Sequence, residues 1–234
     1  MEKKEFLKGF KDGIPIGLGY LSVSISIGIM AVGSGLSVIS SLLISMTNLT
    51  SAGQVAGISV IASGGTLIEI ALTQLVINMR YSLMGISLSQ KADVNFTTPH
   101  RMFLGAFITD EIFGVASSRA GDINTAYMYG LIIVPYIGWA AGTLIGSVMG
   151  KLLPPAIYAA LGLAIYGMFI AIVVPAMKKS REIAFAVLIA AAISTAIHFI
   201  PLLSGIGFGF SVIISSLVAS VIMAFISVRR RQDK

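Results

Sequence analysis

The chain has 234 residues, of which 56% are hydrophobic and 11% are charged, and its formal net charge is +6. Ordinary soluble proteins carry about 25% charged residues, so this composition excludes a typical soluble globular domain. The apolar runs are long, which is typical of transmembrane helices of roughly 20 residues and not of the short alternating strands of a membrane barrel. We therefore predict an all-α polytopic integral membrane protein.

Most of the positive charge lies near the two ends of the chain, at Lys3, Lys4, Lys8, Lys11, Arg229, Arg230, Arg231 and Lys234. Positive clusters beside transmembrane spans mark the cytoplasmic side, so this charge indicates topology and not a nucleic-acid surface. The chain has no cysteine, which excludes disulfides and thiolate metal sites. His100 and His198 have no neighbours at ligand spacing, and we expect no metal and no cofactor.

The first twelve residues alternate charges with apolar side chains, which predicts an amphipathic N-terminal segment (residues 1–12) at the inner membrane interface. A basic start before an apolar run also occurs in signal peptides, but the run 14–35 is longer than their usual 7 to 15 or so residues. We expect residues 13–228 to form a single transmembrane transport domain. Residues 229–234 would then be a basic cytoplasmic tail.

The apolar runs predict seven or eight transmembrane helices. The predicted spans cover residues 14–35, 36–63, 65–90, 102–118, 124–150, 156–177, 183–200 and 208–228. The second and fourth are candidates for a break, because glycine, amide, hydroxyl or carboxyl residues interrupt them. In the second span, either the helix unwinds at a cavity, or Gly53 and Gly57 let another helix pack closely.

The loops do not give a fully consistent topology. The basic loop after the sixth span places the C-terminus in the cytoplasm, and eight crossings place the N-terminus there as well. The loop 91–101 then lies outside despite its positive residues. If the run 36–63 dips into the membrane and returns, this loop moves inside, seven crossings result and the N-terminus changes side. We prefer the eight elements.

Four ionisable residues and an amide lie within two neighbouring spans: Glu69, Asn78, Arg80, Asp110 and Glu111. A charge near the centre of a membrane helix costs roughly 2.5 to 3.5 kcal/mol on insertion scales, so these groups must face the protein interior or water. Glu69 and Arg80 share almost the same helix face about 16 Å apart, too far to pair with each other. Arg80 could pair with Asp110 or Glu111 simply to hold two helices together. We favour the interpretation that the charges line a substrate or proton path.

Four glycines in the fifth span recur at a period of four: Gly138, Gly142, Gly146 and Gly150. Small residues at this spacing allow close helix–helix contact in lipid. We expect this face to pack against another span or another subunit.

Several polar interruptions have a characteristic order. SAGQVAG (51–57), INMRYSLMGISLS (77–89) and TDEIFGVASSR (109–119), followed by GWAAGTLIGSVMG (138–150), resemble the AzlC-type family of branched-chain amino-acid exporters. The resemblance implies export of branched-chain or other hydrophobic amino acids across the bacterial inner membrane. It also implies a small AzlD-type membrane protein as partner.

A zwitterionic substrate in a low-dielectric cavity needs a partner at each charged end. Arg80 is the candidate for the substrate carboxylate, because guanidinium is always charged and can bind through two hydrogen bonds. Asp110 or Glu111 would bind the ammonium group. Further candidate binding residues are Asn78, Ser51 and Gln54, the last two beside a helix break whose amides could assist.

Proton coupling requires a carboxylate that alternates between its charged and protonated forms. Glu111 and Glu69 are the candidates for this role.

Two other function classes remain open. An intramembrane enzyme could use Asp110 and Glu111 with water, but adjacent helical residues point about 100° apart and form no shared-proton dyad. No nucleophile or metal-binding motif accompanies them, so we expect no enzyme. Alternatively, the chain is a structural membrane subunit whose charges bind a partner.

Overall fold

The computed structural model describes residues 2–94, 96–150, 154, 167, 170, 173–203 and 205–232, with no side chains beyond residue 226. Most of these residues are helical, and no strand occurs among them. Four of their helices are long and apolar enough to cross a membrane: α1 (Glu2–Gly33), α7 (Thr125–Met149), α9 (Arg181–Phe199) and residues 208–226 of α10 (Phe208–Gln232). This confirms the all-α membrane fold. The predicted span 156–177 lies largely outside the described residues, as do residues 233 and 234 of the predicted tail.

The chain forms two compact units. Unit 1 comprises Met1–Val55 and Asn78–Gly162, and unit 2 comprises Ala56–Ile77 and Leu163–Lys234. Helices α3 (Ser51–Ala62) and α4 (Leu67–Ser89) each begin in one unit and end in the other. The single transmembrane domain expected over residues 13–228 stays a prediction.

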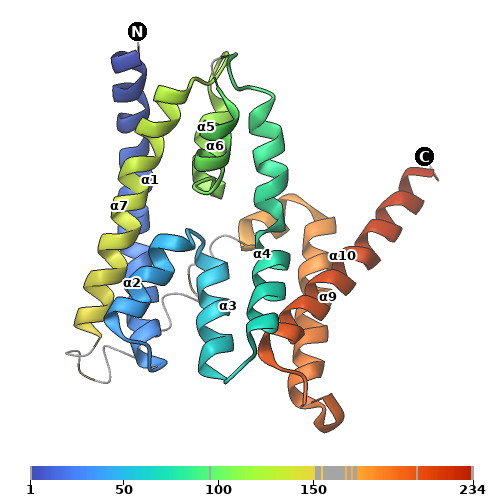
Figure 1. Cartoon of the computed structure of the whole chain (residues 1–234). Coiled ribbons are helices and arrows are strands. Elements are labelled where there is room, and N and C mark those ends of the chain that lie inside the picture. The colour runs from blue at the N-terminus through green and yellow to red at the C-terminus, as the bar shows by residue number, and fades with distance from the viewer. Residues whose placement is uncertain are drawn as a thin grey trace. The chain divides into compact units, whose positions relative to one another are not determined.

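Unit 1 is built around a parallel pair of helices, α1 and α7, which lie side by side over most of their length (Figure 1). Their glycines touch the backbone of the opposite helix. A Cβ on Gly9 would lie 2.0 Å from the carbonyl oxygen of Tyr127, and a Cβ on Gly146 would lie 2.0 Å from that of Ile25. Only glycine allows backbones to approach this closely. The glycine face predicted for residues 138–150 therefore lies against α1.

The predicted second span is a hairpin of two short helices. Helix α2 (Val38–Thr47) has 10 residues and α3 has 12, so they are about 15 and 18 Å long, well short of the roughly 30 Å hydrocarbon core. The side-chain amide of Gln54 donates to Ser45 Oγ at 2.8 Å, so the first turn of α3 lies back against α2. This geometry favours a dip and return over the single crossing that we preferred.

The predicted fourth span is also wrong as a single crossing. It consists of α5 (Thr98–Gly105) and α6 (Asp110–Ser118), joined by residues 106–109. The Ile123 N–H donates to the Lys91 carbonyl at 2.7 Å, and Lys91 Nζ donates to the Ser117 carbonyl at 2.7 Å. The chain therefore enters and leaves this hairpin at the same end of unit 1 (Figure 1).

The start of α1 lies at that same end, because Glu5 forms an ion pair with Arg119 just after α6. This cationic end of unit 1 carries Lys3, Lys4, Lys8, Lys11, Lys91, Arg101 and Arg119. The positive-inside rule places it on the cytoplasmic side. Both predicted topologies place the loop 91–101 and the N-terminus on opposite sides of the membrane. This is wrong, because the two segments lie at the same end of unit 1. Residues 2–12, expected to lie at the interface, are the first turns of a continuous α1.

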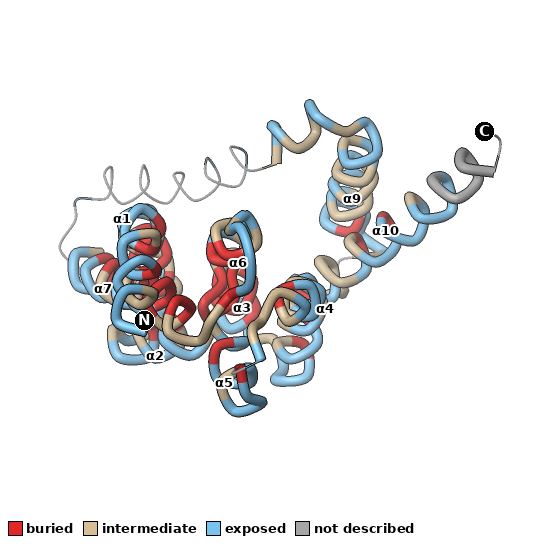
Figure 2. Tube along the Cα trace, turned by 90° about the horizontal axis from the view of Figure 1, so that it is seen from above, coloured by how far each residue is buried: buried red, intermediate tan, exposed pale blue. Residues whose placement is uncertain are grey.

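The core of unit 1 lies along α1, α6 and α7. Figure 2 shows buried residues gathered on α1 and α6. Ile27, Ile112 and Leu131, one from each of the three helices, are at most 1% exposed. This packing fixes α6, and with it the residues at its N-terminus, against α1.

Unit 2 contains the first turns of α4 together with α9 and α10, which follow each other through the short 3-10 turn Pro201–Leu203. Glu69 is buried in this unit, and its Oε1 accepts the Gly209 N–H at 2.7 Å. A Cβ on Gly207 or Gly209 would lie 2.6 to 3.0 Å from Glu69 Oε1, so glycine at both positions lets the carboxylate reach the N-terminus of α10.

Candidate functional site

Two threonines mark the tips of the two hairpins in unit 1. Thr109 caps α6, its hydroxyl accepting the Ile112 N–H at 3.4 Å, and Thr50 accepts the Gly53 N–H at 3.3 Å. Threonine is a favoured residue at this capping position because its oxygen satisfies a free amide of the first turn. Both second half-helices therefore begin at hairpin tips, where their N-termini carry partial positive charge.

Arg80 and Asp110 form an ion pair with 2.8 Å between Nη1 and Oδ2. Arg80 lies nine residues, or about 14 Å, before the end of α4, which is at the cationic end. Helix α5 has eight residues, so the tip of the second hairpin lies about 12 Å from the same end. These depths are close to the middle of a bilayer core about 30 Å thick. The two side chains are 44% and 40% exposed, so a second molecule can reach the pair.

Tyr20 connects Glu111 to the capping threonine of the same helix. Its hydroxyl lies 2.5 Å from Glu111 Oε2 and 2.5 Å from Thr109 Oγ1. A tyrosine hydroxyl has one proton, so it donates to only one of these oxygens at a time. The Trp139 ring packs edge-on against Tyr20, with 5.1 Å between ring centroids, and holds the phenol in place.

Tyr81 connects the ion pair to the other hairpin tip. Its hydroxyl donates to Thr50 Oγ1 at 3.2 Å and accepts from Arg80 Nη2 at 3.2 Å. The two tyrosines are arranged reciprocally. Tyr20 comes from α1, which precedes the first hairpin, and contacts the tip of the second. Tyr81 comes from α4, which precedes the second hairpin, and contacts the tip of the first. We call this set of seven residues the tip cluster: Tyr20, Thr50, Arg80, Tyr81, Thr109, Asp110 and Glu111.

Three of the predicted site residues thus lie together, namely Arg80, Asp110 and Glu111. Ser51 is the first residue of α3, directly after Thr50, and Asn78 lies on α4 two residues before Arg80. Both are therefore close to the cluster in sequence.

Two other predicted residues have different surroundings. Gln54 is 1% exposed and donates to Ser45, whose hydroxyl is 2.6 Å from that of Thr143 on α7. Its Oε1 has no hydrogen-bond partner among the described residues. Gln54 thus connects the first hairpin to α7, while Glu69 makes its contacts within unit 2.

Sequence reasoning missed both tyrosines and both threonines of the cluster. The threonines carried a usable signal, because each directly precedes a polar or small first turn, as capping residues do. Tyr81 stands next to Arg80 and could have been included on that ground. Tyr20 has no such signal, since it lies within an otherwise apolar span.

The charges of the tip cluster determine what it can bind. Arg80 is cationic while Asp110 and Glu111 are anionic when ionised, so the formal net charge is −1. One further positive charge, from a proton or a ligand, would neutralise it in a region of low dielectric. Among the described residues no three His, Asp or Glu side chains come together as a metal site.

The chain is similar in sequence to several membrane proteins. The chain is 28% identical over 212 residues to the inner membrane protein YgaZ of Escherichia coli, covering 86% of each chain. It is also 28% identical over 201 residues to an uncharacterized membrane protein of Archaeoglobus fulgidus, covering 85% of this chain and 87% of that one. A membrane protein of Helicobacter pylori is 26% identical over 155 residues, which is 63% of this chain and 67% of that one.

No solved structure matches the chain. Residues 15–153 match the AzlC protein family, and these residues include both hairpins and the whole tip cluster. The chain is therefore a membrane protein that belongs to the AzlC family.

Proposed function

We propose that the protein is a transporter subunit that exports branched-chain or other hydrophobic amino acids across the bacterial inner membrane in exchange for protons. Membership of the AzlC family supports a role in membrane transport. The observation that carries the proposal is the tip cluster: a guanidinium and two carboxylates, with a net charge of −1, held at membrane depth between two helix breaks.

Arg80 is the proposed partner of the substrate carboxylate. Its guanidinium already binds a carboxylate, that of Asp110, and remains 44% exposed. A guanidinium has five N–H donors in a planar fork, so it can hold Asp110 and a substrate together. The first amides of α3, beginning at Ser51, and the Asn78 side chain are the proposed additional donors.

Glu111 or Asp110 is the proposed partner of the substrate ammonium. An ammonium bound here would neutralise the excess negative charge, and leaving it unpaired at this depth would be costly. The aliphatic side chain would contact the apolar surfaces of the surrounding helices, which favours hydrophobic amino acids over polar ones.

The same excess charge provides a coupling mechanism. A proton on Glu111 and the ammonium of a substrate would each neutralise the cluster, so the two would exclude each other. Alternate binding of proton and substrate then gives exchange across the membrane. Glu69 is the second candidate for the proton, through its contact with the N-terminus of α10.

The test of the substrate site is export of radiolabelled leucine, isoleucine and valine from proteoliposomes that contain this chain with and without an AzlD-type partner. We expect Arg80→Gln and Arg80→Lys to abolish export while inserting normally. Lys11→Gln, which removes a positive charge at the cationic end and outside the cluster, is the control and should export normally. Undiminished export by a stably inserted Arg80→Gln variant would eliminate the assignment.

The same vesicles test the coupling. Flux that persists unchanged when the pH gradient is collapsed rules out proton exchange. If flux depends on the gradient, Glu111→Gln and Glu69→Gln identify the proton site, because the glutamine amide can still accept a hydrogen bond but cannot titrate. The residue whose replacement removes the pH dependence binds the proton.

The expected partner is a small AzlD-type membrane protein, with lipid covering the remaining apolar surface and no role for nucleic acid. Export by this chain alone would show that the partner is dispensable, and export only with it would support an obligatory pair. No export in either case would favour a structural subunit. A covalently altered amino acid after incubation would point to an enzyme instead.

A further inference from the structure

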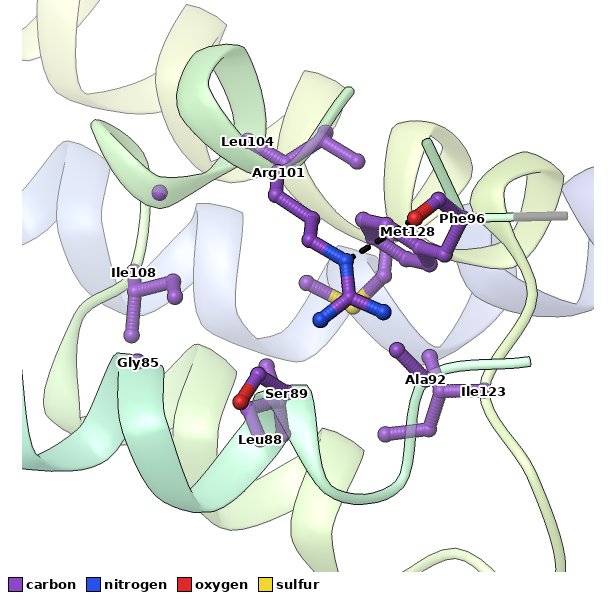
Figure 3. A pocket seen from close by; sticks show the side chains of 11 residues that line it. Gly85, Leu88, Ser89, Ala92, Phe96, Arg101, Leu104, Ile108, Ile123 and Met128 are labelled. Carbon is purple, nitrogen blue, oxygen red and sulfur yellow. Dashed lines mark hydrogen bonds between the residues drawn. The ribbon is translucent and has the colours of Figure 1, made fainter. Parts of the chain in front are cut away.

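A cavity separate from the tip cluster lies near the cationic end of unit 1, beside the second hairpin (Figure 3). Its volume is about 160 Å³. An engineered protein cavity of about 150 Å³ is large enough to hold benzene, so this one accommodates roughly six heavy atoms. The lining residues come from the end of α4 and the loop after it, from α5 and its tip, and from the start of α7 and the residue Ile123 before it.

The wall of this cavity is mainly apolar, with Ser89 and Arg101 as its polar side chains. Leu88, Leu104, Ile108, Ile123 and Met128 supply most of its surface. Among the described lining residues, Arg101 alone is charged. Figure 3 shows its guanidinium reaching from α5 into the ring of apolar side chains.

The guanidinium of Arg101 is held in place but not neutralised. Its Nε donates to the Phe96 carbonyl at 2.9 Å, and the group lies over the Phe96 ring at 5.9 Å from the centroid. Among the described residues, no carboxylate forms an ion pair with it. Arg101 is an exposed residue, so water solvates its guanidinium, and an anion that enters the apolar hollow can form a charge-assisted hydrogen bond with it.

From these features we propose that the cavity is a binding site for a small apolar monocarboxylate, with the carboxylate on Arg101 and an aliphatic tail of about four to five carbons among the apolar side chains. A free amino acid fits poorly, because no acidic side chain among the described lining residues could pair with its ammonium. This distinguishes the cavity from the tip cluster, which offers both charges. A long acyl chain does not fit the volume.

The position of the cavity gives its occupant a means to act on the hairpin. Ile108 lines the cavity and directly precedes Thr109, Asp110 and Glu111. A bound tail would fill the space behind the tip and resist its movement. The binding claim itself is independent of the transport proposal, because it concerns Arg101 and not Arg80.

The test is isothermal titration of the purified full-length protein in detergent with 4-methylpentanoate, which is leucine without its ammonium group, after subtraction of a protein-free micelle titration. We expect saturable binding that leucine does not displace. Acetate lacks the tail and loses the apolar burial, whereas 4-methylpentan-1-ol lacks the charge and loses the charge-assisted contact with Arg101. Each should bind at least about tenfold more weakly.

Two variants test the site from different sides. Arg101→Gln removes the charge and should weaken binding at least about tenfold, while Lys11→Gln at the same end of unit 1 should not. Gly85→Leu removes the space, because a Cβ there would lie 3.8 Å from Ile108 Cδ1 inside the cavity, and it should abolish binding without lowering thermal stability.

Each of the two variants can contradict the proposal by itself, so the test remains possible if one of them fails to fold. Equal affinity in wild type and Arg101→Gln would overturn the proposal, as would unchanged binding by Gly85→Leu. Tighter binding of hexadecanoate than of 4-methylpentanoate would indicate a lipid-tail site and overturn the short-chain assignment. Displacement by leucine would show that the carboxylate binds at the tip cluster instead.

Discussion

The tip cluster and the glycine-lined contact between α1 and α7, which we call the α1–α7 seam, both include residues of α1 but differ in how closely they are packed. Along the seam, glycines bring the two backbones into contact, and a Cβ on Gly138 would lie 2.4 Å from the Gly17 carbonyl oxygen. Three residues after Gly17, Tyr20 reaches toward α6 and holds Glu111 and Thr109 through its hydroxyl. The glycines of the seam leave no room for a side chain, whereas the Arg80 and Asp110 side chains of the cluster are more than a third exposed.

This difference indicates that the α1–α7 seam keeps the helices fixed, while the residues of the tip cluster can exchange binding partners. In lipid no hydrophobic force drives helices together, so close backbone packing is the main stabilising interaction along the seam. The hairpin tips, in contrast, are held by a few hydrogen bonds, each worth about 1 kcal/mol net. We therefore expect seam variants to affect folding and cluster variants to affect transport.

Substitution in the seam should have the largest effect. Gly146→Leu would place a Cβ 2.0 Å from the Ile25 carbonyl oxygen, so α1 and α7 would have to separate. Overpacking typically costs about 1 to 3 kcal/mol and more where the backbone cannot move, and we expect little folded protein in the membrane. Size-exclusion profiles in detergent and thermal unfolding would measure the loss.

The control for this prediction is on α1. Gly19 has no heavy atom within 4 Å of a Cβ built on it, so Gly19→Leu adds the same side chain two residues from Gly17 but away from α7. We expect its thermal stability to match wild type. Equal destabilisation by both leucines would mean that the glycine contacts do not hold the seam.

Tyr20→Phe should give the next largest effect, on transport. The variant keeps the ring that packs on Trp139 but removes the hydroxyl that contacts both Glu111 and Thr109. We expect export to fall about tenfold, as one lost hydrogen bond to a charged group predicts, with a much smaller change in thermal stability. Initial export rates in proteoliposomes would measure it.

Tyr136→Phe is the matched control, since the Tyr136 hydroxyl donates to the Met46 carbonyl outside the cluster. It should leave the export rate unchanged. If Tyr20→Phe destabilises the protein as severely as Gly146→Leu, then Tyr20 is needed for folding. The distinction between a seam that stabilises and a cluster that transports would then be wrong at this residue.

Composition and glycine spacing were enough to predict the fold class and the packing face. Long apolar runs with few charges require helices in lipid, and the all-α membrane fold is confirmed. The polar interruptions at residues 47–54 and 109–111 also marked real helix breaks. Whether a broken run crosses or returns could not be predicted, because a hairpin of two half-helices and one irregular crossing contain similar numbers of apolar residues.

The charged part of the cluster was predictable because charges are rare at membrane depth. Arg80 and Asp110 were paired in one interpretation of the sequence, and they form an ion pair. Tyr20 could not be predicted, since its role depends on α1 and α6 being neighbours across 91 positions in the chain. Gln54 was grouped with the site because it follows the break, but its direction toward Ser45 depends on how α3 folds back.

Tyr81→Phe should affect transport less than Tyr20→Phe. Its hydroxyl bonds to Thr50 and Arg80 are each 3.2 Å long, which indicates weaker interactions than the 2.5 Å contacts of Tyr20. We expect a two- to threefold loss of export, because bonds this long should each contribute only about 0.5 kcal/mol, the low end for a hydrogen bond. A larger loss than that of Tyr20→Phe would show that the first hairpin tip, and not the second, dominates the site.

Thr143→Val should give the smallest effect. It tests whether the contact between α7 and the first hairpin serves stability alone or also transport. Thr143 lies on α7, its hydroxyl is 2.6 Å from that of Ser45, and its backbone faces Gly28 in the seam. Valine preserves the shape, and Ser45 still accepts from Gln54, so only one buried hydrogen bond is lost, about 1 kcal/mol. Thermal unfolding should shift slightly while the export rate stays at the wild-type value. A fall in export comparable to that of Tyr81→Phe would mean that the attachment of the first hairpin to α7 takes part in transport, because stability and transport would then depend on the same contact.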